Sequence, residues 1–186
     1  MMPGLNECGR IARTGPMRRF ETVKRLIDIT VSGALLILLL PLGLLCGLLV
    51  FLTSSGPIVY SSRRLGKHGA VFNLLKFRSM RPGAPDWRNA DGSSFSSADD
   101  PRVTGVGRLL RKTSLDELPQ IVNVFKGDMS LVGPRPDQAD QIRYYSEADL
   151  EKLAVKPGIT GLAQINGRNS IPWETRRALD IEYVRK

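Results

Sequence analysis

The chain has 186 residues, a formal net charge of +9 and an isoelectric point near 10.0. Its length fits one modest domain, and its basic balance fits nucleic acid, anionic lipid or a phosphorylated substrate. Aromatic residues make up only 6 %, and the sequence has no zinc-ligand spacing or nucleic-acid-binding module, so we favour membrane and phosphate over nucleic acid.

The chain begins with a basic polar arm, residues 1–22, and a long apolar run follows. No charged residue occurs between positions 29 and 62, and the 24 residues of 29–52 are enough to cross a bilayer core of roughly 30 Å. A signal peptide is a poor match, because the run starts late, is too long and lacks an A-x-A exit. The arm holds Cys8 and the apolar run holds Cys46, so we expect free thiols and a reducing, cytoplasmic setting.

Two features favour a re-entrant helix over the plain transmembrane helix that hydropathy alone indicates. Basic residues flank the apolar run on both sides, and the positive-inside rule then keeps both ends cytoplasmic. Pro41 lies near the middle, so the helix should bend there into arms of about 12 residues, or roughly 18 Å each. Residues 23–55 are therefore predicted to form a helix–break–helix element that enters one leaflet and returns.

The residues just before the apolar run are expected at the lipid head groups. Lys24 and Asp28 are four residues apart and share a helix face, with Arg25 beside them. An ordinary solvent-exposed helix face is the alternative interpretation.

A cytoplasmic domain is expected over residues 56–186, α+β in class and mostly helical. Residues 58–60 and 71–77 predict a short β-hairpin whose turn holds His68, the only histidine. That position is more typical of a solvent-facing residue than of a catalytic one. Residues 81–107, rich in Pro, Gly, Ser and Asp, predict a mobile loop.

Two adjacent acids, Asp116 and Glu117, have a structural interpretation. Ser114 and Glu117 show the S-x-x-E spacing of a capping box at a helix start. If Ser114 began a helix, however, Pro119 would be its fifth residue, where the ring and the missing N–H damage the hydrogen-bond ladder. A broken local rule beside clustered charges is where a functional site is expected.

The same acids are suited to phosphate chemistry. Arginines hold the anion, and a carboxylate attacks the phosphorus or binds its metal ion. Both interpretations are compatible, because the dipole of a helix N-terminus would keep Asp116 ionised, as a nucleophile or metal ligand requires. Basic residues lie on both sides of the pair in the sequence: Arg108, Arg111, Lys112 and Arg135. With the apolar run, they indicate membrane-associated phosphoryl or phosphosugar chemistry.

The remaining pattern predicts helices and a glycine-rich loop. Residues 121–126 continue a helix that ends at Gly127, and 137–154 indicate a polar helix. The loop 158–169 has three glycines, which let backbone N–H groups approach a phosphate; a purely structural turn is the alternative. A last helix should begin near Pro172, because proline is common in a first turn.

Five motifs in this order make the chain similar to the bacterial sugar transferases. These monotopic phosphoglycosyl transferases start the assembly of capsule, exopolysaccharide, O-antigen or glycoprotein glycans on polyprenol phosphate. The resemblance runs from about Val23 to Val184, and the arrangement is that of the small form of the family, although the chain ends sooner than most relatives. The motifs are Lys24-Arg25-x-x-Asp28, Lys76-Phe77-Arg78-Ser79-Met80, Ser114 to Gln120, Lys126 to Pro136, and Pro157 to Asn169.

The resemblance implies a two-step reaction at the bacterial inner membrane, with the catalytic domain on the cytoplasmic face. Asp116 would attack the β-phosphate of a UDP-sugar, release UMP and hold the phosphosugar until polyprenol (undecaprenyl) phosphate accepts it. Mg²⁺ is expected at Asp116, while Glu117 would position the metal ion or deprotonate the acceptor. The family's substrate and phosphate positions fall here on Arg78, Arg111, Arg135, Gln164 and Arg168.

Two departures from the family pattern and one alternative function stay open. Ser62 stands where the family often has Gln, and Leu40 where it has the serine before the helix-breaking proline. A catalytically silent membrane adaptor of a glycan assembly complex is the alternative function. The implied partners are a UDP-sugar, polyprenol phosphate and the lipid bilayer, with no nucleic acid, and self-association into a homo-oligomer is left open.

Overall fold

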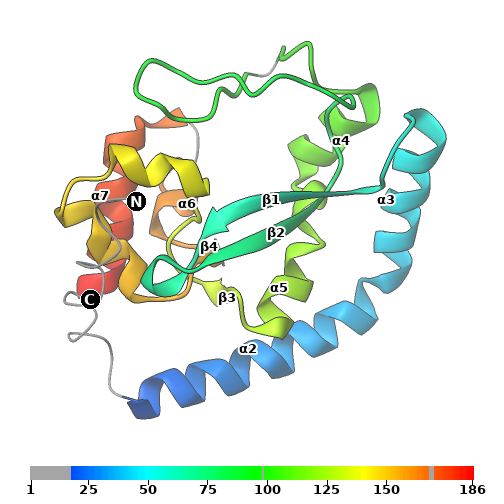
Figure 1. The fold of residues 1–186 in the computed structure, drawn as a ribbon. Coiled ribbons are helices and arrows are strands. Elements are labelled where there is room, and N and C mark those ends of the chain that lie inside the picture. The colour runs from blue at the N-terminus through cyan, green and yellow to red at the C-terminus, as the bar shows by residue number, and fades with distance from the viewer. Residues whose placement is uncertain (1–17, 98, 168–169) are drawn as a thin grey trace.

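A computed structural model describes residues 18–97, 99–167 and 170–186. These residues form an α+β fold, which confirms the predicted class (Figure 1). The α-helices are α2 Arg18–Leu38, α3 Leu40–Thr53, α4 Gly105–Thr113, α5 Gln120–Lys126, α6 Leu162–Ile165 and α7 Trp173–Arg185. The strands are β1 Val59–Leu65, β2 Val71–Phe77, β3 Ser130–Val132 and β4 Gly158–Thr160. The 3₁₀-helices are η2 Lys67–Gly69, η3 Leu115–Glu117, η4 Ala139–Tyr144 and η5 Ala148–Ala154. As predicted, α5 ends at Gly127 and α7 starts directly after Pro172.

The apolar run forms two helices, α2 and α3, that meet at a bend of 61° and follow two adjacent sides of the domain (Figure 1). The predicted break is confirmed, but it falls at Leu39 rather than at Pro41. Pro41 fits the first turn of α3, where its N–H is not needed, while its ring prevents the preceding turn from continuing as one helix. Among the described residues no single helix is long and apolar enough to cross a membrane, whereas α2 and α3 meet the length and composition requirement as a pair.

The two arms are unequal, which corrects the prediction of about 12 residues each. α2 has 21 residues and α3 has 14, because α2 already begins at Arg18, inside the predicted arm 1–22. The arm before Arg18 lies outside the described residues. Both helices carry large apolar side chains that the described residues leave exposed: Leu26, Ile37, Leu38, Leu44, Phe51 and Leu52.

The predicted β-hairpin is confirmed and crosses the middle of the domain (Figure 1). β1 and β2 pair antiparallel, from Val59 opposite Phe77 to Leu65 opposite Val71. His68 lies in the turn, exposed and with a left-handed φ of 57°, as expected of a turn residue.

Two apolar clusters hold the helices against this hairpin. The first joins α3, β2 and α4 through Cys46, Val50, Phe77 and Leu110. The second joins β2 to α5 and the residues after it through Leu74, Val124 and Met129. Full burial of one such side chain stabilises the fold by roughly 1.5–3 kcal/mol, so the hairpin is the support on which the three helices are fixed. The thiol of Cys46 is free, as expected, and Cys8 lies outside the described residues.

Residues 81–104 form an irregular segment, as predicted, with its own buried ion pair. Arg102 donates to both carboxylate oxygens of Asp100, at 2.9 and 2.6 Å, and both side chains are buried. The guanidinium also lies 4.5 Å from the ring centroid of Trp87. α4 begins directly after Thr104, whose side chain caps it, so the loop ends slightly earlier than predicted.

The polar helix predicted over 137–154 is wrong. Two 3₁₀-helices, η4 and η5, occupy this range, and Tyr145 between them is extended. The reason is the buried Lys152, whose Nζ donates to the carboxylates of Asp137 and of Asp180 in α7, at 2.8 Å each. These long-range contacts outweigh the local helix propensity that the sequence pattern expressed.

The predicted glycine loop 158–169 is partly regular, because β4 pairs parallel with β3 and α6 follows. A Cβ at Gly158 would come 2.1 Å from the backbone N of Gly133, and a Cβ at Gly161 would come 2.2 Å from its carbonyl O. These two glycines therefore allow close backbone packing, which supports the structural alternative. Positions 168–169 lie outside the described residues.

Candidate active site

A short turn between α4 and α5 carries the acid pair. Ser114 ends α4 with a left-handed φ of 59°, η3 follows, and Pro119 is the N-cap of α5. The capping-box interpretation is wrong, because the Ser114 side chain makes no cap hydrogen bond in η3 and the Glu117 carboxylate pairs with two cations instead. The interruption that Pro119 was expected to cause is present, and it separates the two helices.

Glu117 bridges two basic side chains. Its Oε1 accepts hydrogen bonds from Lys76 Nζ at 2.8 Å and from Arg135 Nη2 at 3.0 Å. Burial alone would raise the pKa of Glu117, but the charges and hydrogen bonds of Arg135 and Lys76 outweigh it and lower the pKa to about 2. So acidic a carboxylate is a weak base at neutral pH, which argues against the proton-transfer role expected for Glu117.

Asp116 has a different environment. Its side chain is buried, and burial raises its pKa above the ordinary value, an effect that the charges of Lys76 and Arg111 only partly offset. The helix dipole expected to keep Asp116 ionised is weak here, since η3 is a single 3₁₀ turn rather than the start of an α-helix. The two acids therefore have pKa values shifted in opposite directions, which is typical of neighbouring carboxylates with different roles.

The predicted phosphate residues divide into two groups. Arg135 lies beside the acids and forms an ion pair with Glu117. Arg111 lies close enough for its charge to lower the pKa of Asp116, and its Nε donates to Ser79 Oγ. Arg78 is engaged elsewhere: its Nη2 donates to a backbone carbonyl and a hydroxyl at the end of α3, both at 2.7 Å. The structure thus brings two of the three arginines to the acid pair.

The last two predicted substrate residues are not joined to the acids by any described contact. Gln164 is buried in α6, and neither atom of its amide has a hydrogen-bond partner among the described residues. Arg168 lies outside the described residues. The substrate roles of both stay predictions.

The residues expected at the lipid head groups fix α2 to the domain. Asp28 is buried, and its Oδ1 accepts from Ser130 Oγ at 3.1 Å and from the Leu131 N–H at 3.0 Å. Arg25 donates to two carbonyls near the end of α5 at 2.7 Å each, and Lys24 donates to a carbonyl of β3 at 2.9 Å. Asp28 is therefore no solvated surface residue, and a lipid contact of Lys24 and Arg25 stays a prediction.

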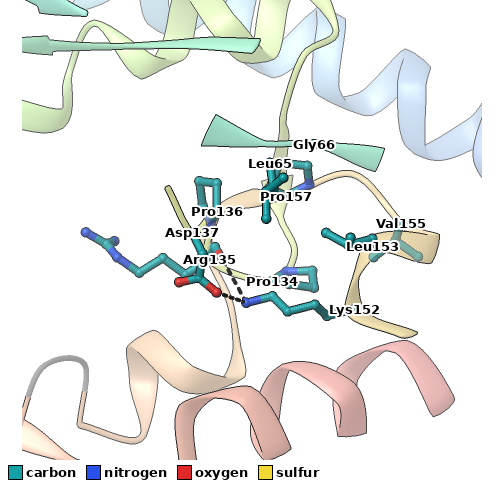
Figure 2. Close-up of a pocket in the computed structure, with 10 residues that line it drawn as sticks. All are labelled: Leu65, Gly66, Pro134, Arg135, Pro136, Asp137, Lys152, Leu153, Val155 and Pro157. Atoms are coloured by element: carbon teal, nitrogen blue, oxygen red, sulfur yellow. Dashed lines mark hydrogen bonds and ion pairs between the residues drawn. The ribbon is translucent and has the colours of Figure 1, made fainter. Parts of the chain in front are cut away.

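A small cavity of about 10 Å³ lies behind Arg135 (Figure 2). The guanidinium of Arg135 points away from this cavity, while its backbone carbonyl accepts from Lys152 Nζ at 3.2 Å (Figure 2). Lys152 also pairs with the side-chain carboxylate of Asp137, so one buried ammonium holds this segment through the Arg135 carbonyl and the Asp137 side chain. With a proline on each side, Arg135 has a fixed backbone from which its side chain reaches the acids.

Sequence reasoning missed two residues of the site, Lys76 and Gln120. Lys76 reaches Glu117 across 41 positions of the chain, and Gln120 is buried at the start of α5. Both lie inside the motifs quoted above, so the signal was present. It could not say which basic residue of the motif 76–80 faces the acids.

The oxygen donors of the acid pair fit a magnesium ion that is bound by one carboxylate together with substrate phosphate oxygens. Among the residues that the structure describes, no group of three His, Cys, Asp or Glu side chains could hold a metal ion. Mg²⁺ is commonly bound by one or two carboxylates together with substrate phosphate oxygens. Because Glu117 is occupied by two cations, Asp116 is the carboxylate that fits this mode.

Comparison with known proteins decides the family. The bacterial sugar transferase family matches residues 19–186. The chain belongs to this family. It is 46 % identical over 162 residues to the uncharacterized sugar transferase EpsL of Bacillus subtilis, a match that covers 87 % of this chain and 77 % of EpsL.

Two further relatives have names that state an activity. The undecaprenyl-phosphate galactose phosphotransferase of Salmonella typhimurium is 41 % identical over 187 residues, covering 95 % of this chain and 39 % of that protein. The undecaprenyl-phosphate glucose phosphotransferase of Komagataeibacter xylinus is 45 % identical over 174 residues, covering 87 % of this chain and 32 % of that protein. The chain thus spans less than two fifths of these two relatives, and the family resemblance drawn from the motifs is confirmed.

Proposed function

We propose that the chain is a phosphoglycosyl transferase, which moves a sugar 1-phosphate from a UDP-sugar to polyprenol phosphate as the first membrane step of glycan assembly. The observation that carries the proposal is the buried carboxylate of Asp116 among Lys76, Arg111 and Arg135. Relatives named as undecaprenyl-phosphate galactose and glucose phosphotransferases support a lipid phosphate as acceptor and a sugar phosphate as the transferred group.

The reaction would run in two displacement steps. An oxygen of Asp116 attacks the β-phosphorus of the UDP-sugar, and the bond from that phosphorus to the bridging oxygen breaks, so that UMP leaves. An oxygen of polyprenol phosphate then attacks the phosphorus held on Asp116, giving polyprenol diphosphate sugar and returning the carboxylate.

The basic side chains would supply most of the electrostatic stabilisation. Arg135 and Lys76 both point at Glu117, which fixes them beside Asp116 before a substrate arrives. Donors held in place in this way stabilise the charge that develops on phosphate oxygens without reorganising during the reaction. Mg²⁺ at Asp116 would add neutralisation of the diphosphate charge. Glu117 is then a positioning residue, consistent with its low pKa.

The bent helix pair would place this site at the bilayer. α2 and α3 expose large apolar side chains, among them Leu38, Phe51 and Leu52. A re-entrant position in one leaflet, with the domain on the cytoplasmic face of the inner membrane, agrees with the basic flanks and brings the acceptor's phosphate toward the domain.

The test is UMP release by purified chain in detergent with Mg²⁺, polyprenol phosphate and a set of UDP-sugars. We expect release with at least one sugar, and none from Asp116→Asn. Mass spectrometry without acceptor should find a phosphosugar on the peptide that contains Asp116. A folded chain that releases no UMP from any UDP-sugar would favour the adaptor; release without an adduct would favour direct transfer.

A further inference from the structure

A cavity of about 20 Å³ is lined in part by Lys76 and Arg135, the two side chains that pair with Glu117. β1, β2, α5 and the segment after β3 meet at it, and its lining residues are Arg64, Leu74, Lys76, Gln120, Arg135 and Pro136. Arg64 pairs with Phe72, so both side chains lie on the same face of the hairpin. Lys76 is four residues after Phe72 in β2, and an even spacing keeps it on that face. Three cations from different parts of the chain therefore converge on one small space.

Gln120 brings an unpartnered amide to this cavity. The residue is only 3 % exposed, yet no described residue forms a hydrogen bond with its side chain. Its amide is not among the fully enclosed polar atoms that lack a partner, and Gln120 lines the cavity. The amide N–H donors can therefore meet a ligand oxygen there.

The residues that line the cavity include three cations and no carboxylate. Glu117 is shared by Lys76 and Arg135, whereas no carboxylate of the described residues lies within ion-pair distance of Arg64. Arg64 donates only to neutral oxygens, the hydroxyl of Ser62 at 3.1 Å and a backbone carbonyl at 3.5 Å. Burial, and then the nearby charge of Arg135, lower the pKa of Arg64 to about 10, and the charge of Asp137 offsets this only in part. An anion in the cavity would therefore stabilise the charged guanidinium.

We propose that Arg64, Lys76 and Gln120 form a pocket for the oxygens of a second phosphate group, beside the phosphate that Asp116 attacks. The proposal rests on the proposed function, in which a nucleotide phosphate and a lipid phosphate both come to the acids. Arg64 offers a planar fork of donors, and Gln120 adds an amide N–H. The space suits about one phosphate oxygen rather than a nucleotide, so the pocket binds one side of a phosphate monoester and leaves its substituent outside.

The test measures binding without turnover. Purified chain in detergent is titrated by calorimetry with UMP and, separately, with a short-chain polyprenyl phosphate. Arg64→Gln removes the charge, and Gln120→Leu removes the amide at similar volume. Arg63→Gln is the matched control, because Arg63 is the neighbouring exposed residue, on the opposite face of β1.

We expect Arg64→Gln and Gln120→Leu to bind one of the two phosphates about tenfold more weakly, while Arg63→Gln binds both like the wild type. A loss confined to UMP assigns the pocket to the nucleotide phosphate, and a loss confined to polyprenyl phosphate assigns it to the acceptor. Unchanged affinity for both ligands in both variants overturns the proposal.

Thermal unfolding separates this role from a structural one. Because Arg64 has no carboxylate partner among the described residues, Arg64→Gln should keep or raise the unfolding midpoint, whereas a structural role would lower it. If Arg64→Gln does not fold, Arg64→Lys gives the same comparison, since lysine keeps the charge and loses the fork. Failure of the proposed function has a different result, because the wild type would then release no UMP from any UDP-sugar. If the wild type binds neither UMP nor polyprenyl phosphate, the pocket proposal is overturned as well.

Discussion

Replacing Glu117 by Gln tests how the acid pair is built. The pKa of Glu117 falls from 4.5 to about 2 because Arg135 and Lys76 hold its charged form. A shift of this size corresponds to about 3 kcal/mol, and the side chain is only 19 % exposed, so solvent screens little of it. Since the folded pKa lies below the unfolded one, this stabilisation is fully present above about pH 4.5 and is lost as the pH falls toward 2.

Urea unfolding in detergent measures the effect. Glu117→Gln should lower the free energy of unfolding by about 3 kcal/mol at pH 7 and pH 5, and by progressively less below pH 4.5. Glu182→Gln is the control, because Glu182 forms an exposed pair with Lys186 and should change stability by about 0.5 kcal/mol or less. If the free energies of unfolding of the wild type and Glu117→Gln differ little at pH 7, or differ by the same amount from pH 7 to below pH 4.5, the predicted role of Glu117 is wrong.

The pH dependence of turnover separates positioning from proton transfer. Glu117→Gln should lower activity, because Lys76 and Arg135 lose their shared carboxylate. The shape of the pH–rate profile should stay that of the wild type, since a group with a pKa of about 2 does not titrate near neutrality. Loss of a limb between pH 5 and 8 would instead assign proton transfer to Glu117.

Three further substitutions test other parts of the structure. Pro41→Ala should restore a helical N–H and let part of the population cross the bilayer, so that single cysteines near positions 18 and 64 label from opposite sides rather than from one. Arg135→Lys should keep the charge but lose the planar guanidinium, reducing UMP release about tenfold or more; an unchanged rate would assign Arg135 to surface charge. Asp180→Asn should lower the free energy of unfolding by about 1–3 kcal/mol, measured in urea, because the buried Lys152 loses one of its two carboxylates and keeps Asp137.

The sequence predicted the elements whose cause is local. Proline at position 41 indicates a helix break from local sequence alone, and strand-forming residues on both sides of the turn at His68 indicate a hairpin in the same way. The acid pair was found for a similar reason: Pro119 interrupts a helical pattern beside clustered charges. The order of the five motifs then indicated the bacterial sugar transferase family.

What the sequence could not supply are contacts between distant segments. The pattern over 137–154 fits a helix, and only the pairing of Lys152 with Asp180 shows why the segment bends instead. For the same reason, the sequence did not predict that Lys76 pairs with Glu117. Strand alternation predicts on which face of β2 a side chain lies, but not which residue of another element contacts it. Arg78 and Lys76 are equally basic in the sequence, yet only Lys76 meets the acids.

These distant contacts connect α7 to the proposed phosphate site. Its Asp180 accepts from the backbone N–H of Arg135 at 3.4 Å and holds Lys152, which in turn donates to the Arg135 carbonyl. On the other side, the backbone of Gly133 fits only because Gly158 and Gly161 have no side chains. The main chain of Arg135 is thus fixed from α7 and from the glycine turn, while Glu117 fixes its guanidinium. A change in α7 should therefore move Arg135, the proposed phosphate-binding arginine, through the contacts of α7 and Lys152 with its backbone.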